Sequence, residues 1–154
     1  MRLYAMHLEE ILTPERCFCD LHATSKKRVL KTISELIEKD VMDLSANDIF
    51  DALMAREQLG STGVGNGIAI PHCRVAQCNK IIGALVTLSD PIDFDAIDSK
   101  PVDILFVLIV PDKKTDEHVK TLGRLAELFN DEDFCYILRH THNSEDLYNV
   151  TVTH

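Results

Sequence analysis

The stretch Gly60 to Arg74, GSTGVGNGIAIPHCR, constrains the fold more than any other part of the sequence. Its first half places four glycines among small polar residues, a composition that favours positive φ and brings backbone N–H groups close to a ligand. These residues are Gly60, Gly63, Gly65 and Gly67, with Ser61, Thr62 and Asn66. The second half opens with a short apolar run, 68–70, which predicts a buried strand. Pro71 should end that strand, because proline fixes φ and lacks an N–H donor. The pattern therefore predicts His72 at the exit of a rigid strand, beside a loop of amide donors that suits an anionic phosphoryl group.

Two better-known phosphate-binding motifs do not fit this stretch. The dinucleotide fingerprint has a different glycine spacing and opens a helix, whereas an apolar strand follows here. A Walker loop would end in Gly-Lys-Ser or Gly-Lys-Thr, which is missing. A glycine loop followed by one histidine is also typical of a tight turn before a core strand, with His72 as a buried, hydrogen-bonded side chain.

Composition limits the class of protein. The 154 residues are 45% hydrophobic, which fits one globular domain over residues 1–154. A net charge of −9 argues against nucleic acid or an anionic membrane as a partner. Five cysteines without the spacing of a disulfide framework fit a reducing cytosol. The N-terminus lacks an apolar signal segment, and the longest apolar run, 104–110, is too short for a bilayer. We therefore expect a cytoplasmic protein with no membrane span.

Hydrophobic periodicity predicts helices that alternate with strands. The expected helices are 7–12, 25–39, 45–60, 115–129, 131–139 and 144–150, and the expected strands are 17–21, 68–70, 81–88 and 102–110. Strands 81–88 and 102–110 are apolar throughout, as in strands covered on both faces. The acidic connection from Asp90 to Asp98 is short enough to allow an antiparallel pair. The pattern predicts a three-layer α/β/α sandwich with a mixed sheet.

Two further side chains are expected near His72. Arg56 lies on the last turn of the helix that ends before the glycine loop, so it is the best-placed cation for a phosphoryl group. The alternative for Arg56 is a surface ion pair. His118 falls in the first turn of the helix that follows strand 102–110, capped by Thr115 or Asp116. There the helix dipole favours a neutral imidazole, and free N–H groups favour a nearby anion.

The string GSTGVGNGIAIPH resembles the active-site signature of the enzyme IIA components of the bacterial phosphotransferase system, in the mannitol/fructose-type family. The segment 91–98, leading into 101–103, resembles the nitrogen-regulatory branch, and the likeness extends from about Ser25 to Val150. The resemblance implies a mixed, five-stranded sheet, phosphorylation of His72, and a site completed by His118 and Arg56. It also implies a histidine phosphocarrier protein (HPr-like or NPr-like) as donor, and regulated partners such as potassium-transport or sensor proteins. Cys73 departs from the family, where glycine is common after the histidine.

The chemistry of these residues supports a phosphoryl carrier. A neutral imidazole is a competent nucleophile near pH 7, and it would attack in line through a loose transition state. The negative oxygens would be stabilised by Arg56, His118 and the loop, which comprises Ser61, Thr62, Gly63, Gly65 and Gly67. The resulting phosphohistidine is labile, which suits a carrier, and no cofactor is expected.

Three alternatives remain open at this point. A sugar-specific enzyme IIA would pass its phosphoryl group to a permease subunit, although we expect no fused membrane domain. A metal-binding module or hydrolase would use His72, Cys73, Cys78 and His118, but Cys73 should point to the opposite strand face and Cys78 lies in a polar turn. A pure interaction domain would leave both histidines without chemistry.

Overall fold

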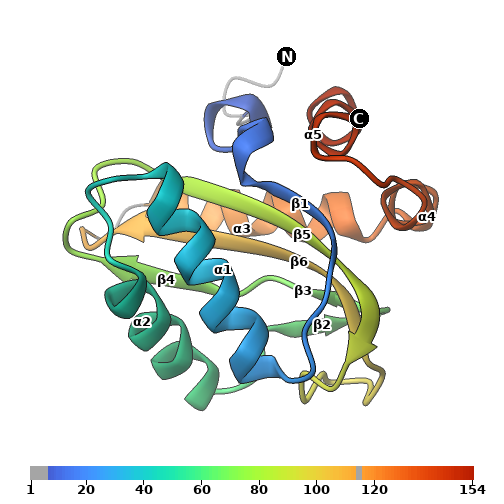
Figure 1. The fold of residues 1–154 in the computed structure, drawn as a ribbon, viewed down its shortest axis with the longest axis horizontal. Coiled ribbons are helices and arrows are strands. Elements are labelled where there is room, and N and C mark those ends of the chain that lie inside the picture. The colour runs from blue at the N-terminus through green and yellow to red at the C-terminus, as the bar shows by residue number, and fades with distance from the viewer. Residues whose placement is uncertain (1–6, 114–115) are drawn as a thin grey trace.

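A mixed six-stranded sheet separates two layers of helices (Figure 1). The computed structural model describes residues 7–113 and 116–154. The strands are β1 (Cys17–Leu21), β2 (Gly63–Gly65), β3 (Ile68–Ala69), β4 (His72–Val75), β5 (Ile82–Ile92) and β6 (Val102–Pro111). The helices are α1 (Lys26–Asp40), α2 (Ala46–Gln58), α3 (Asp116–Phe129), α4 (Glu132–Arg139) and α5 (Ser144–Thr153), preceded by the short 3₁₀ helices η1 (Leu8–Glu10) and η2 (Pro14–Arg16). The predicted three-layer α/β architecture is confirmed.

The strand order is β1-β5-β6-β3-β2, and β4 also pairs with β6. Strands β5 and β6 are antiparallel, whereas β1 runs parallel to β5, and β3 and β4 run parallel to β6. This mixture of directions confirms the predicted mixed sheet. The residue pattern predicted four strands and the resemblance implied five, whereas six are observed in the described residues. Relative to the four, the glycine stretch contributes β2, and the strand beside β6 is divided into β3 and β4.

Local sequence signals position the helices. The side chains of Ser25 and Ser45 each accept a hydrogen bond from the backbone N–H group three residues further along the chain, so they are the N-caps of α1 and α2. Asp131 caps α4 in the same way. Helix α3 begins at Asp116, and the other expected cap, Thr115, lies outside the described residues.

Pro71 interrupts the sheet edge but does not end it, so the expectation that the ladder stops there is wrong. Strand β3 pairs with β6 at Ile104 and Leu105, and β4 resumes the pairing with His72 opposite Leu108. The Pro71 carbonyl still accepts a hydrogen bond from the Leu108 N–H at 2.9 Å. The ring nitrogen, which lacks a hydrogen, sits between the two paired segments, where no donor is needed. His72 therefore opens a strand.

The acidic connection also begins later than expected. Strand β5 runs on to Ile92, so Asp90 and Pro91 belong to the strand and not to the loop. The register with β6 shifts between Thr87 and Ile92, and such an irregularity accommodates a proline.

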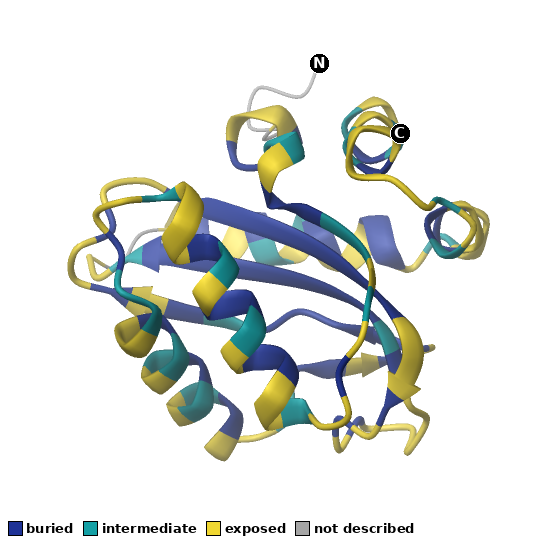
Figure 2. Ribbon diagram, in the orientation of Figure 1, coloured by how far each residue is buried: buried dark blue, intermediate teal, exposed yellow. Residues whose placement is uncertain are grey.

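The two faces of the sheet carry separate apolar cores, visible as the buried strands between half-exposed helices in Figure 2. One core packs α1 and α2 against alternate residues of β4, β5 and β6, and the other packs α3, α4 and α5 against the remaining ones. On α3, Leu125 and Phe129 are buried, but Val119 is 66% exposed. The first turns of α3 therefore leave part of the sheet edge uncovered. Each helix in the described part of the chain is too short or too polar to cross a bilayer.

Candidate active site

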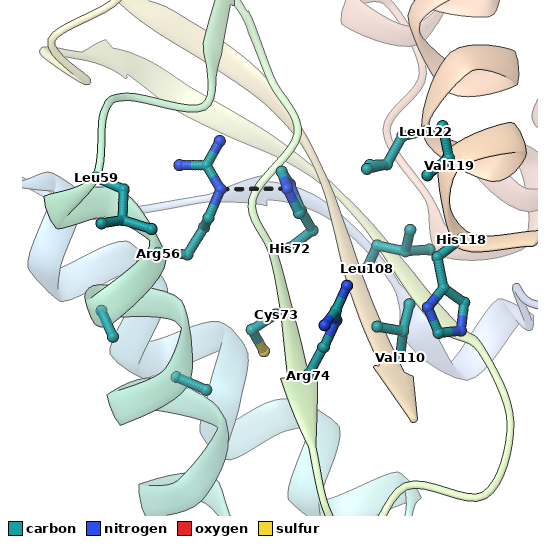
Figure 3. Close-up of a pocket in the computed structure, with 12 residues that line it drawn as sticks. Arg56, Leu59, His72, Cys73, Arg74, Leu108, Val110, His118, Val119 and Leu122 are labelled. Carbon is teal, nitrogen blue, oxygen red and sulfur yellow. Dashed lines mark hydrogen bonds between the residues drawn. The ribbon is translucent and has the colours of Figure 1, made fainter. Parts of the chain in front are cut away.

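The uncovered edge forms a cavity of about 520 Å³ between the end of α2, strand β4 and the first turns of α3 (Figure 3). Its wall is mostly apolar and is lined by Ala52, Ala55, Leu59, Cys73, Leu108, Val110, Val119 and Leu122, with the polar residues Arg56, His72, Arg74 and His118. None of the described residues that line the cavity is acidic, although the chain has 25 acidic residues against 16 lysines and arginines. The cavity thus gathers cationic and imidazole groups in an acidic protein, as an anion-binding site requires.

The ring of His72 is fixed on both sides. Its Nδ1 lies 2.9 Å from the Ile70 carbonyl oxygen, which can only accept, so Nδ1 carries the hydrogen and donates. Its Nε2 then carries the lone pair, and it accepts a hydrogen bond of 3.3 Å from Arg56 Nε. Burial lowers the pKa of His72, and the positive charge of Arg56 lowers this pKa further, against the opposing effect of the Ile70 hydrogen bond. The ring is therefore neutral at pH 7, with Nε2 as its nucleophilic atom.

Arg56 reaches His72 from the last turn of α2, as the sequence predicts. Its Nη1 donates to the Gly60 carbonyl at 2.9 Å, while its Nε faces the ring of His72. The guanidinium is thereby held between the helix end and the nucleophile (Figure 3). No ion pair joins Arg56 to a carboxylate within the described residues, so the surface-ion-pair alternative is not observed.

The glycine loop is not part of the cavity wall. Ser61 and Thr62 lead into β2, and β2 pairs with β3 as a hairpin through Gly63 opposite Ala69 and Gly65 opposite Ile68. Gly65 and Gly67 have φ of +103° and +84°, so the positive φ expected for the loop is present. The residues named for a phosphoryl loop, which are Ser61, Thr62, Gly63, Gly65 and Gly67, are not among those that line the cavity around His72.

Amide groups of the loop are used within the protein instead. The Gly63 N–H donates to Ser61 Oγ at 3.0 Å, and the Asn66 N–H donates to Asp98 Oδ2 at 2.9 Å. The Thr62 N–H and hydroxyl both donate to the buried carboxylate of Glu57, the residue that follows Arg56. Because these donors are already paired, they are not available to a ligand. The loop supports the site indirectly, since it anchors the end of α2 that carries Arg56.

His118 lines the same cavity but does not contact His72. The residue is 7% exposed, and its Nδ1 is buried without a hydrogen-bond partner among the described residues. Figure 3 shows its ring beside Val110 and turned away from the ring of His72. The structure therefore brings both histidines to one cavity without joining them by a hydrogen bond.

Strand alternation separates the residues that follow His72. Cys73 is buried in the core beneath α1 and α2, whereas Arg74 returns to the face of His72 and is exposed. Arg74 is a cavity residue that the sequence reasoning missed, although a period of two from His72 would have found it. Within the described residues, no three histidine, cysteine or acidic side chains are grouped so that they could hold a metal ion.

Comparison with known proteins gives the family. Residues 10–152 match the family described as phosphoenolpyruvate-dependent sugar phosphotransferase system, EIIA 2. The chain belongs to this family. Proteins of the family are phosphotransfer components, so the cavity around His72 lies in an EIIA protein of the phosphotransferase system.

The proteins to which this EIIA chain is similar include nitrogen regulatory proteins. The chain is 46% identical over 147 residues to the nitrogen regulatory protein of Pseudomonas aeruginosa, with 96% of both proteins covered. It is 42% identical over 146 residues to the nitrogen regulatory protein of Escherichia coli, with 94% of this chain and 89% of the relative covered.

Solved structures share the fold. The crystal structure of the nitrogen regulatory protein IIA-Ntr from Neisseria meningitidis matches with a TM-score of 0.87 at 38% identity, over 94% of this chain and 98% of the other. The mannitol IIA structure from Escherichia coli matches with a TM-score of 0.76 at 20% identity, over 91% and 98% of the two chains. The recognised family, with its nitrogen-regulatory branch, is thus confirmed.

Proposed function

We propose that this EIIA protein is a phosphohistidine carrier of the nitrogen-regulatory phosphotransferase system, with His72 Nε2 as the acceptor. The observation that carries the proposal is the hydrogen-bonded state of the ring. The Ile70 carbonyl accepts the hydrogen bond of Nδ1, so the lone pair lies on Nε2, and Nε2 faces Arg56 at a cavity whose described lining residues include no acidic side chain.

The transfer step follows from this geometry. His72 Nε2 attacks the phosphorus of a phosphohistidine on the donor protein, and a new P–N bond forms as the donor's P–N bond breaks. The electron pair of the broken bond returns to the donor's ring nitrogen. Arg56 Nε moves from the His72 nitrogen to a phosphoryl oxygen, so the same guanidinium serves the resting and the phosphorylated states. The Ile70 carbonyl keeps the ring oriented throughout.

We assign His118 a supporting role. It lines the cavity as an imidazole whose Nδ1 has no partner in the part of the chain that the structure describes, and it can donate one N–H to a phosphoryl oxygen once its ring turns from Val110. Loss of a hydrogen-bond donor to the charge that develops in a transition state typically slows the reaction by about 10²–10³-fold.

The proposed donor is an HPr-like or NPr-like phosphocarrier protein. The rim of the cavity offers such a partner exposed apolar side chains, because Leu59 is 84% and Val119 is 66% exposed. The regulated partners are proteins of nitrogen or potassium metabolism, such as potassium-transport or sensor proteins in the cytoplasm. A phosphoryl group adds about −1.5 to −2 charges, which would invert the electrostatics of the cationic cavity and let a partner distinguish the two states.

A sugar-specific role is the second candidate. The observation that favours it is a 40% identity over 83 residues to the fructose-specific EIIA component of Haloferax volcanii, over 54% of each chain. The similarity to nitrogen regulatory proteins covers far more of the chain, so we place the regulatory role first. We also expect residues 1–154 to act as one EIIA domain.

The test is incubation with phosphoenolpyruvate and the general phosphotransferase proteins, followed by intact mass measurement. We expect one acid-labile phosphoryl adduct on the wild type and none on His72→Ala. His22→Ala, at an exposed histidine outside the cavity, is the matched control and should accept the group normally. An adduct that persists in His72→Ala contradicts the proposal.

A further inference from the structure

Arg74 lies on the same strand as the proposed nucleophile and lines the same cavity. It lies on β4 two residues after His72, so both side chains leave the same face of the strand. His72 pairs with Leu108 and Arg74 with Val110 in the ladder with β6, and all four residues line the cavity. In the view of Figure 3, the Arg74 guanidinium lies between the rings of His72 and His118.

The two arginines of the cavity differ in what they already bind. Arg56 donates to His72 Nε2 and to the Gly60 carbonyl, so two of its donors are committed. Arg74, by contrast, has no hydrogen bond or ion pair with any described residue, although a guanidinium carries five N–H donors. Although the chain has 25 acidic residues against 16 lysines and arginines, none of the described residues that line the cavity is acidic.

A phosphoryl group needs more donors than Arg56 can supply. It brings three oxygens and nearly two negative charges into the cavity. Arg56 can turn Nε and Nη2 toward the group while Nη1 stays with Gly60, which leaves part of the charge unmatched. A second guanidinium on the other side of the His72 ring would supply the missing hydrogen-bond donors and positive charge.

We propose that Arg74 binds oxygens of the phosphoryl group carried on His72 and stabilises it during transfer, as a catalytic residue beside Arg56. The inference rests on the proposed function, because it assigns a new contact to the group that His72 accepts. The Arg74 guanidinium has no hydrogen bond or ion pair with the described residues to give up before it binds the group, whereas Arg56 must first leave the His72 nitrogen.

The test uses two phosphoryl donors, so that an effect of Arg74 on the phosphoryl group can be distinguished from an effect on binding of the partner protein. One is the phosphorylated HPr-like carrier, and the other is phosphoramidate, a small donor without a protein surface. The variants are Arg74→Gln, Arg74→Lys and the control Arg28→Gln, an exposed arginine on α1 outside the cavity. Circular dichroism melting should be the same for all four proteins, because both arginines are exposed.

We expect Arg74→Gln to slow single-turnover phosphorylation by about tenfold or more with both donors. Arg74→Lys should recover part of the rate, and Arg28→Gln should match the wild type. In the phosphorylated protein, a ³¹P titration of Arg74→Gln should show a raised second pKa of the phosphoryl group, because a nearby cation has been lost.

Two results would overturn the inference while the proposed function stands. Wild-type rates with both donors in Arg74→Gln would show that Arg74 does not touch the group. A loss with the protein donor alone would show that Arg74 binds the partner surface instead. If the wild type itself accepts no phosphoryl group on His72, the proposed function fails first.

Discussion

The buried carboxylate of Glu57 offers the sharpest test of how the site is supported. Glu57 is 7% exposed and receives three donors, which are the Lys26 ammonium at 2.8 Å, the Thr62 N–H at 3.1 Å and the Thr62 hydroxyl. In Glu57→Ala all three donors lose their acceptor. The Lys26 ammonium keeps weaker contacts, to the Phe94 carbonyl at 3.4 Å, to Asp95 at 3.7 Å and to the face of the Phe94 ring, whose centroid is 4.8 Å away.

The expected loss follows from this geometry. Removing one partner of a buried ion pair typically costs about 3–5 kcal/mol, since the remaining charge stays partly desolvated. Lys26 is 17% exposed and retains some contacts, so we expect the lower end, about 3 kcal/mol. At about 2–4 °C per kcal/mol for a protein of this size, Tm should fall by about 6–12 °C.

Urea and thermal unfolding of Glu57→Ala measure this loss. Glu35→Ala, at an exposed carboxylate on α1, is the control and should change stability by less than about 0.5 kcal/mol. Adding Lys26→Met to Glu57→Ala should restore part of the stability, because the uncompensated charge is gone. A loss below about 1 kcal/mol, or no recovery in the double variant, would refute the reasoning that the Glu57 carboxylate holds Lys26 of α1 and Thr62 of the loop to the end of α2.

Three further outcomes are expected. His118→Ala should slow phosphoryl transfer by about 10²-fold in single-turnover assays, whereas His72→Ala should abolish it, and the reverse result would exchange their roles. A ring-proton NMR titration should place His72 below the usual midpoint of about 6.5, since burial lowers its pKa. Protonation then favours the unfolded state, so the contribution of this ring to stability is present above about pH 6.5 and is lost as pH falls through the lower folded pKa. Gly67→Ala should cost about 1–3 kcal/mol in urea unfolding, because its Cβ would lie 2.6 Å from Arg139 Nη2 at a φ of +84°; Gly123→Ala, with open space around it in α3, should instead stabilise by about 0.5–1 kcal/mol.

The glycine stretch shows where sequence reasoning erred. Its composition correctly predicted positive φ, but loop amides that were expected to face an anion are paired within the protein. The partner that decides this is the Glu57 carboxylate, which reaches Thr62 across a helix end. Composition alone does not distinguish a backbone N–H that is free to bind a ligand from one that already donates a hydrogen bond to a side chain of another element.

By itself the sequence determined the five α-helices to within about three residues at each end, the two central strands and the approach of Arg56 to His72, whereas the expected helix 7–12 is only the 3₁₀ helix Leu8–Glu10. These features depend on periodicity, on capping side chains three residues from their donors, and on a helix that ends at the loop, all of which are local. Only the tertiary structure decided which atom of His72 is free, because that depends on the Ile70 carbonyl and on Arg56 together. It also decided that Pro71 divides a strand that continues along β6, and that Arg74 shares a cavity with His118. Such contacts join residues far apart in the chain, and their geometry is fixed by the packing of α2 and α3 around the sheet edge.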